Sequence, residues 1–400
     1  LNIPCSGFGD IINCSSFYQY LKLWYPDIRV TICTTEINKF KSLGIKGIKI
    51  VELIPKNKYF ETECGNYDNY KFKNKSENNF DLIGVVPLLQ TEGIDGFFHL
   101  SDLQRLIPYA NHYNTFTVSE YNGSTPPYTF PTGVGKGQLG LFLTDLKIEY
   151  HNLIEKPYLM TYTAGIDYAG VSTHAISCFF SFLEMTTLKY KHYSKLQIII
   201  PVWVNLCLQD DPQFKSKMKK IIQKNFKKIS FITDDKRNIN LSDKKGNHFI
   251  IRGDILPQPR NNFISLIKYS LKDILLTGDQ SITDALSYSR MDKRIWYEIA
   301  PWKEEFIYEL SKVIPNKKLQ NFRTSCGCIR CIQTKINNNN IIKKYDFRIL
   351  GKKRMDSVLT QYNMISNKSL ILLKYYYYCL EKSRYKETAL KKLEKYIVIK

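Results

Sequence analysis

The sequence predicts an α/β protein with two tandem domains, each a parallel sheet covered by helices on both faces. Apolar, β-branched segments without polar alternation recur along the chain, as is typical of parallel strands buried on both faces. Between them lie segments with apolar residues at helical spacing. The chain has 400 residues, of which 44% are hydrophobic and 24% charged, so it is long enough for two separate cores.

The amino-terminal half alternates expected helices with expected strands. Helices are predicted at 11–24 and 97–109, and strands at 28–34, 48–54, 81–87 and 114–120. Pro26 and Asp27 end the first helix. We expect the polar segment 56–79, rich in Asn, Lys and Tyr, to be an exposed insertion.

A second βα array follows a stretch rich in Gly, Pro and Thr at 121–140, which is either a linker or an active-site loop. Strands are predicted at 158–162, 196–204 (interrupted by Pro201), 229–233, 248–252, 273–277 and finally 294–299, with helices at 173–188, 212–226, 263–269 and 282–289. The predicted domains are therefore 1–145, 146–335 and a basic helical tail, 336–400, that packs as closing helices.

The formal net charge of +21 comes mainly from lysine, since 46 of the 58 basic residues are Lys and 12 are Arg. Nucleic-acid readers favour Arg for bidentate contacts. The composition therefore favours a solvated, Lys-rich exterior, with nucleic acid as the alternative partner. A positive field would also attract anionic ligands such as nucleotide diphosphates.

Targeting signals and cysteines point to the cytoplasm. No apolar run reaches the roughly 18–20 residues of a membrane span, and we expect no secretory leader. Because residue 1 is not Met, a short preceding segment is expected.

Most of the ten Cys lie in apolar segments, as reduced thiols do. Cys326, Cys328 and Cys331 supply three metal ligands without a fourth nearby, so zinc is disfavoured and no metal is predicted.

Two turns that follow apolar segments are candidates for chemistry. Gly278-Asp279-Gln280-Ser281 follows the strand at 273–277 and begins a helix, whose free N–H groups can bind an anion. Asp279 or Ser281 is equally suited to cap that helix. The amino-terminal loop with Gly7 and Gly9 leads to Asp10, which either caps the first helix or acts as a general base. This loop lacks the third glycine of a dinucleotide fingerprint, which argues against NAD.

These segments resemble GT-B glycosyltransferases, most closely the inverting protein-arginine rhamnosyltransferases and the heptosyltransferases. Gly278-Asp279-Gln280-Ser281 is similar to the Gly-Glu-Asp-Ser turn of the rhamnosyltransferases, although it has one acid fewer. Gly7-Phe8-Gly9-Asp10-Ile11 resembles their Asn-Phe-Gly-Asp-Ile-Gly start and the Gly-Asp start of heptosyltransferases. The resemblance covers residues 2–35 and 250–302 by motif and the middle of the chain only by element order.

The resemblance implies two Rossmann-like domains with an interdomain cleft, and inverting, metal-independent transfer of a sugar from a nucleotide-diphosphate donor. Asp10 would then be the catalytic base, and the donor would be a substrate rather than a cofactor. The predicted donor-binding residues are Gly7, Gly9, Thr163, Gly165, Arg252, Gly278, Asp279, Gln280 and Ser281. For Thr163 and Gly165, in the loop after the strand at 158–162, and for Arg252, in an Arg-Gly-Asp sequence, a simple turn is the alternative interpretation. The acceptor is a protein, a glycan or a small molecule. A nucleic-acid-binding protein, a nucleotide-sugar epimerase and an inactive sugar-nucleotide-binding relative remain as alternatives.

Overall fold

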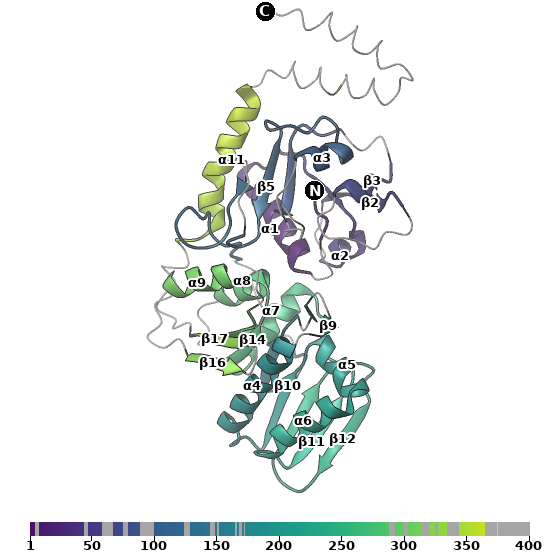
Figure 1. The fold of residues 1–400 in the computed structure, drawn as a ribbon, viewed down its shortest axis with the longest axis vertical. Coiled ribbons are helices and arrows are strands. Elements are labelled where there is room, and N and C mark those ends of the chain that lie inside the picture. The colour runs from purple at the N-terminus through teal and green to yellow at the C-terminus, as the bar shows by residue number, and fades with distance from the viewer. Residues whose placement is uncertain are drawn as a thin grey trace, which may run out of the picture. The chain divides into compact units, whose positions relative to one another are not determined.

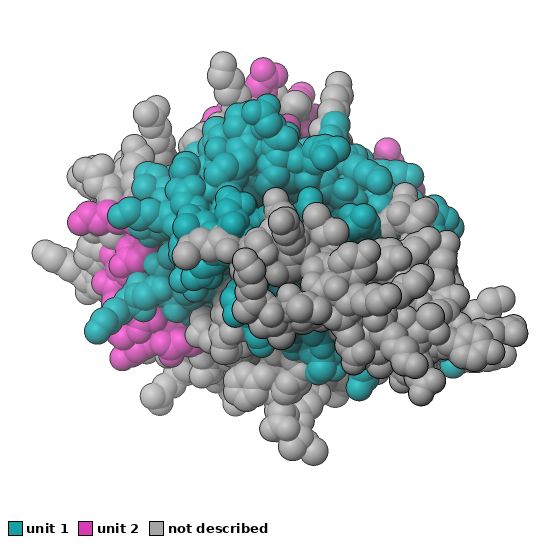
Figure 2. All heavy atoms as spheres, turned by 90° about the horizontal axis from the view of Figure 1, so that it is seen from above, with its two compact units in different colours: residues 1–142, 346–400 teal, residues 143–345 magenta. Residues whose placement is uncertain are grey.

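The chain forms two compact units in a computed structural model (Figure 1). Unit 1 comprises Leu1–Phe142 and Asp346–Lys400, and unit 2 comprises Leu143–Tyr345 (teal and magenta in Figure 2). The structure describes residues 1–4, 8–43, 47–57, 67–74, 79–88, 100–123, 129–144, 149, 152–164, 166–167, 170–171, 173–287, 293–299, 303–313, 320–324, 327–333, 344–364 and 374.

Unit 1 alternates helices and strands and includes α11 from the carboxyl-terminal part of the chain. Its elements are α1 (Gly9–Trp24), β1 (Thr31–Thr34), α2 (Ile37–Ser42), β2 (Lys49–Pro55), the 3-10 turn η1 (Tyr67–Asn69), β3 (Tyr70–Phe72), β4 (Ile83–Leu88), α3 (Leu100–Leu106), β5 (Thr115–Ser119), β6 (Thr129–Phe130) and α11 (Phe347–Met364). The helix predicted at 11–24 and the strands predicted around β1, β2, β4 and β5 are confirmed.

The strands of unit 1 form two three-stranded sheets, β1-β2-β3 and β4-β5-β6, and the first residues of the chain lie between them. Asn2 pairs in parallel with Thr34 of β1, and the Asn2 amide donates to the Cys33 carbonyl. On the other side, Val86 of β4 donates to the carbonyl of Leu1. The parallel strands therefore run β2, β1, residues 1–2, β4, β5, β6, which is the order 3-2-1-4-5-6 of a doubly wound sheet.

Aromatic side chains join α11 to the rest of unit 1. The ring of Phe347 lies 4.8 Å from that of Phe142 and 5.9 Å from that of Phe17 on α1. The prediction of a helix in the tail is confirmed for α11. The prediction that 56–79 is an exposed insertion is wrong in part: Lys56 and Asn57 are exposed, but three aromatic side chains of this segment are buried in the core, namely Tyr67, Tyr70 and Phe72.

Unit 2 is built on one large sheet. Its elements are β7 (Tyr158–Tyr162), the short hairpin β8 (Ile166–Asp167) and β9 (Gly170–Val171), α4 (Thr173–Lys189), β10 (Lys195–Ile199), α5 (Val202–Asp210), α6 (Pro212–Gln223), β11 (Lys228–Ile232), β12 (Asn238–Asp243), β13 (His248–Arg252), α7 (Arg260–Tyr269), β14 (Asp273–Leu276), α8 (Asp279–Ser287), β15 (Arg294–Tyr297), α9 (Glu304–Val313), β16 (Gln320–Thr324) and β17 (Gly327–Gln333).

The sheet of unit 2 has the order β12-β11-β13-β10-β7-β14-β15-β17-β16. The six strands from β11 to β15 pair in parallel, whereas β12, β17 and β16 are antiparallel additions at the two edges. From β7 the chain first adds strands on one side and then crosses to the other side at β14. The switch in direction therefore lies between β7 and β14.

Helices cover both faces of this sheet. Leu159 of β7 and Leu275 of β14 belong to a buried cluster shared with α4, α5 and α6. The opposite face carries Tyr158 and Tyr162. The Tyr158 hydroxyl donates to the Leu266 carbonyl of α7 (3.0 Å), and the ring of Tyr162 lies 5.0 Å from that of Phe263. The prediction of an α/β fold with parallel sheets is thus confirmed.

Two predictions for unit 2 are wrong. The strand predicted at 196–204 ends at Ile199, and Pro201 is the N-cap of α5, because a fixed φ and a missing N–H suit a helix start better than a strand interior. The strand at 294–297 is not the last one, since β16 and β17 follow it. Among the described residues, no helix combines the length and apolar character needed to cross a bilayer.

Candidate functional site

The switch point of unit 2 is the candidate site. In doubly wound sheets, ligands bind outside the carboxyl ends of the strands where the winding reverses. The pairing of β7 with β14 ends at Tyr162 opposite Leu276. Thr163 and Thr277 therefore leave the sheet side by side, and both are buried. The sequence separates these two residues by more than a hundred positions, yet both lie in or next to predicted motifs.

Glu298 ties together the ends of three neighbouring strands at this point. One carboxylate oxygen, Oε2, accepts a hydrogen bond from the amide of Ala164 beyond β7 (3.0 Å). Its backbone amide donates to Leu276 of β14, and its carbonyl accepts from the hydroxyl of Thr277 (3.2 Å). Glu298 is 5% exposed. Glu298 therefore fixes the loop after β7 through its carboxylate and the end of β14 through its backbone.

Thr163 bonds to a side chain of α5, the helix that follows β10. Its hydroxyl accepts a hydrogen bond from the indole Nε1 of Trp203 on α5 (3.1 Å). Burial raises the pKa of the preceding Tyr162 phenol, which is therefore neutral at physiological pH. The loop after β7 is thus fixed at both Thr163 and Ala164.

The predicted turn Gly278–Ser281 forms the beginning of α8. Gly278 has a φ of +77°, which a residue with a side chain adopts only with strain, and the space where a Cβ would lie is empty. The first-turn amides of a helix have no acceptor within that helix, and the helix dipole places partial positive charge there. This geometry suits the close approach of an anionic ligand.

The side chains of this turn bond to their neighbours within unit 2. The Asp279 carboxylate pairs with the ammonium of Lys303 just before α9 (2.9 Å), and the two side chains are only 5% and 7% exposed. The Ser281 hydroxyl donates to the Thr277 carbonyl. The interpretation of Asp279 or Ser281 as a cap of α8 stays a prediction.

Gln280 and Asp284 form a second buried network on α8. Gln280 Nε2 donates to Asp284 Oδ1 (2.8 Å), which also accepts from the guanidinium of Arg260 on α7 (2.9 Å). Among the described residues, Gln280 Oε1 has no hydrogen-bond partner although the residue is 3% exposed. A buried amide oxygen without a donor costs free energy, so a donor from a ligand or a neighbouring loop would stabilise it.

Arg252 lies at the end of β13, which β10 separates from β7. Its guanidinium forms two hydrogen bonds with the carboxylate of Asp254 (2.7 and 2.9 Å) and a third with Gln197 Oε1 (2.9 Å). The structure does not bring Arg252 next to the switch point. A phosphate at Arg252 would compete with a bidentate carboxylate.

In unit 1, the predicted base occupies the first turn of α1. Gly9 is the first residue of this helix, Phe8 is its N-cap, and Asp10 is half-buried. A carboxylate in a first turn interacts favourably with the helix dipole. The backbone carbonyl of Asp10 accepts from Asn2 Nδ2 (3.3 Å), which ties the start of α1 to the strand between β1 and β4. Asp10 therefore lies at the carboxyl edge of the unit 1 sheet.

Several predicted residues lie outside the described residues, among them Gly7, Gly165 and Cys326. Cys328 and Cys331 belong to β17. Among the described residues, no group of three or more His, Cys, Asp or Glu side chains is arranged to hold a metal ion.

Sequence reasoning missed Glu298 and Lys303. Glu298 was included in a predicted strand, and an acid directly after three apolar residues is a usable signal for a strand end. Lys303 had no local signal, since its partner Asp279 lies 24 positions earlier. In the comparisons with known proteins, no family model and no curated protein matches the chain.

Proposed function

We propose that this protein is a glycosyltransferase that takes its sugar from a nucleotide-diphosphate donor bound by unit 2. The observation that carries the proposal is the arrangement at the switch point. There, the start of α8 follows a glycine with positive φ and lies beside the fixed loop after β7. A diphosphate needs closely spaced donors and positive charge, and the first-turn amides of α8 offer both.

The buried groups around the turn support a polar ligand with both anionic and hydroxyl groups. The ammonium of Lys303 neutralises the carboxylate of Asp279 at the amino-terminal end of α8, so the positive end of the helix dipole remains available to an anionic ligand. Gln280 Oε1 offers an acceptor for a hydroxyl or a base N–H. Sugar nucleotides carry all of these groups, so one ligand class accounts for the whole arrangement.

In the proposed reaction, Asp10 of unit 1 is the general base. It takes the proton from the acceptor nucleophile while that atom bonds to the anomeric carbon and inverts its configuration. The bond from the anomeric carbon to the diphosphate oxygen breaks, and the electron pair leaves with the nucleotide diphosphate. The first-turn amides of α8 stabilise the negative charge that grows on this leaving group. The two-domain GT-B arrangement, with the donor and acceptor sides facing one cleft, is part of this proposal.

Donor binding is tested with Gly278→Ala and a matched control. Both Gly278 (φ +77°) and Gly137 (φ +81°) have positive φ, and no atom of a more distant residue lies within 4 Å of the place that a Cβ would take at either position. Both substitutions should therefore cost a similar ~1 kcal/mol of backbone strain. We expect UDP-, GDP- or dTDP-sugars to raise the melting temperature of the unmodified chain and of Gly137→Ala, and not that of Gly278→Ala.

The catalytic step is tested separately with Asp10→Asn. We expect turnover to fall by roughly 10²–10⁴-fold, with donor binding unchanged. Asp102→Asn, in the first turn of α3, is the control for the helix-dipole effect and should retain turnover. If no sugar nucleotide stabilises the chain and DNA or RNA does so with a steep salt dependence, the protein binds nucleic acid instead.

A further inference from the structure

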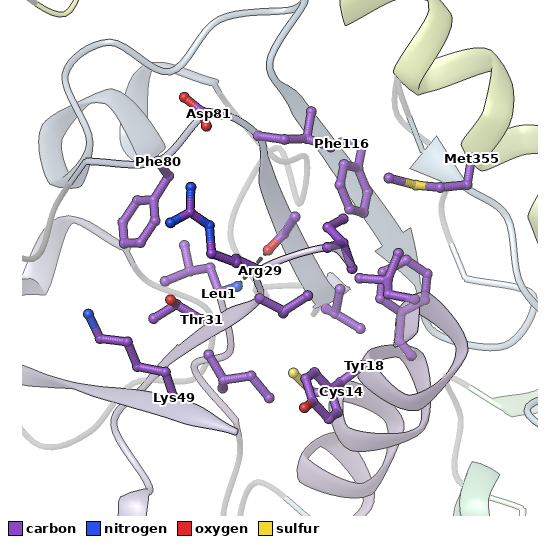
Figure 3. A pocket seen from close by; sticks show the side chains of 18 of the residues that line it. Leu1, Cys14, Tyr18, Arg29, Thr31, Lys49, Phe80, Asp81, Phe116 and Met355 are labelled. Atoms are coloured by element: carbon purple, nitrogen blue, oxygen red, sulfur yellow. Dashed lines mark hydrogen bonds between the residues drawn. The ribbon is translucent and has the colours of Figure 1, made fainter. Parts of the chain in front are cut away.

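A cavity of 1330 Å³ opens in unit 1 beside Leu1, at the amino ends of the parallel strands (Figure 3). Asp10 follows the carboxyl end of the strand that begins at Leu1, so it lies at the other edge of the sheet. The cavity is lined by the amino-terminal ends of β1 and β4, the carboxyl-terminal half of α1 and part of α11. Small-molecule pockets enclose roughly 300–1000 Å³ and lie at the carboxyl ends of such strands. The volume of this cavity and its position at the amino ends of the strands therefore indicate an occupant other than a small molecule.

The cavity interrupts a hydrogen-bond ladder. Leu1 occupies the place of a central strand: its carbonyl accepts from the Val86 amide, and its ammonium donates to the Gly84 carbonyl (2.6 Å). Asn2 makes the corresponding contact with Cys33 of β1. The ladder thus runs up to Leu1 on both sides, and the cavity lies directly beyond it (Figure 3).

The register shows which backbone groups border the cavity. In a strand, the N–H and C=O of one residue point to the same neighbour, and alternate residues point to opposite neighbours. Cys33 faces Asn2, so Thr31 of β1 faces the same side, toward the cavity. Gly84 faces Leu1, so Leu82 also faces the cavity, whereas Ile83 donates to Asn114 on the far side.

We propose that this cavity holds an extended strand continuous with Leu1, formed by residues that precede Leu1 in the polypeptide. Because Asn2 pairs with Thr34, the residue before Leu1 would lie level with Ile32, and the next three with Thr31, Val30 and Arg29. The first of these residues donates to the Thr31 carbonyl. The second donates to the Leu82 carbonyl and accepts from the Gly84 amide.

The lining predicts the composition of this strand. Phe17 and Leu21 of α1, together with Phe116 and Met355, form the apolar part of the lining, and Arg29, Lys49 and Asp81 belong to its charged part. The side chains on the strand would pack against the apolar part. A central parallel strand covered by helices is a nearly continuous apolar run. The inserted residues are therefore expected to be Val, Ile or Leu. This inference does not depend on the proposed glycosyltransferase activity.

The test compares four forms of the full chain: one that begins at Leu1, one with Val-Val-Ile-Val placed before Leu1, one with Gly-Ser-Gly-Ser there, and one with Val-Val-Pro-Val. Proline at the second position before Leu1 removes the donor to the Leu82 carbonyl and leaves the extension otherwise apolar. Amide exchange at Thr31 and Gly84 and the melting temperature are measured for each form.

We expect the Val-Val-Ile-Val extension to slow exchange at Thr31 and Gly84 at least tenfold and to raise the melting temperature by several degrees. The Gly-Ser extension should do neither. The proline form keeps the acceptor for the Gly84 amide but loses the neighbouring hydrogen bond to Leu82, so it should raise the melting temperature less than Val-Val-Ile-Val does. Equal exchange in all four forms would overturn the proposal. So would equal stabilisation by the proline form, since non-specific apolar contact would then explain the effect.

Discussion

The buried ion pair between Asp279 and Lys303 provides a quantitative test of the candidate site. Removing one partner of a buried pair typically costs about 3–5 kcal/mol, because the remaining charge stays desolvated and unpaired. Here the two single variants should differ. Lys303→Met leaves a carboxylate in the first turn of α8, where the helix dipole recovers about 1 kcal/mol, whereas Asp279→Asn leaves a cation at the same positive end.

We therefore expect Lys303→Met to lower the free energy of unfolding of unit 2 by about 3 kcal/mol and Asp279→Asn by about 4–5 kcal/mol. Unit 2 spans residues 143 to 345, which is 203 residues. For a domain of this size, 1 kcal/mol shifts the melting temperature by about 2–4 °C, so Lys303→Met should lower it by roughly 6–12 °C.

The double variant gives the control. With both charges removed, no unpaired charge remains, and the loss should be smaller than for either single substitution. Urea unfolding followed by circular dichroism measures all three variants. Losses below about 1 kcal/mol for both single variants, or a double variant equal to their sum, would refute the assignment of a coupled, desolvated pair.

Three further predictions concern other parts of the chain. Burial raises the pKa of the Cys14 thiol from 9.0 to about 11, so its alkylation by iodoacetamide at pH 8, followed by mass spectrometry, should be about 100-fold slower in the folded than in the unfolded protein. Burial, and then the nearby Lys228, lower the pKa of His248 below 6.5, so the unfolded state binds more protons than the folded state in acid. The urea concentration at the unfolding midpoint of unit 2 should therefore fall between pH 7 and pH 5. In His248→Gln, this midpoint should fall less over the same pH range. Gly133→Ala should destabilise unit 1 by about 2–4 kcal/mol in thermal unfolding, because φ is +123° and the added Cβ would overlap the side chain of Asn122; a loss under about 1 kcal/mol would contradict the close packing there.

The parallel strands could be predicted from the sequence because they are buried on both faces. Residues 158–162 and 248–252 are apolar runs, and the predicted bounds match β7 and β13. The antiparallel edge strand β12 was missed, since its exposed side carries polar residues and its pairing with β11 depends on tertiary contact. The buried aromatic residues of 67–72 were missed because the surrounding polar composition hides their periodicity.

The candidate site was predictable only where it consists of backbone. The Gly278 turn has a local signature, a glycine between a strand and a helix, and the structure places a positive φ there. Glu298 and Lys303 act through partners that folding brings close. The three apolar residues before Glu298 mark a strand end but not its partners, and no local pattern marks Lys303. The order of β7 and β14 in the sheet, which defines the switch point, also follows from crossover connections rather than from any single segment.

The central claim is that the switch point of unit 2 binds a nucleotide-diphosphate sugar. Hydrogen–deuterium exchange of the full chain with and without a stabilising sugar nucleotide tests it most directly. Our account predicts slower exchange at the amides of residues 163–164 and 278–281, with no comparable change at the amides of α6. Protection confined to other segments, with these amides unchanged, would contradict it.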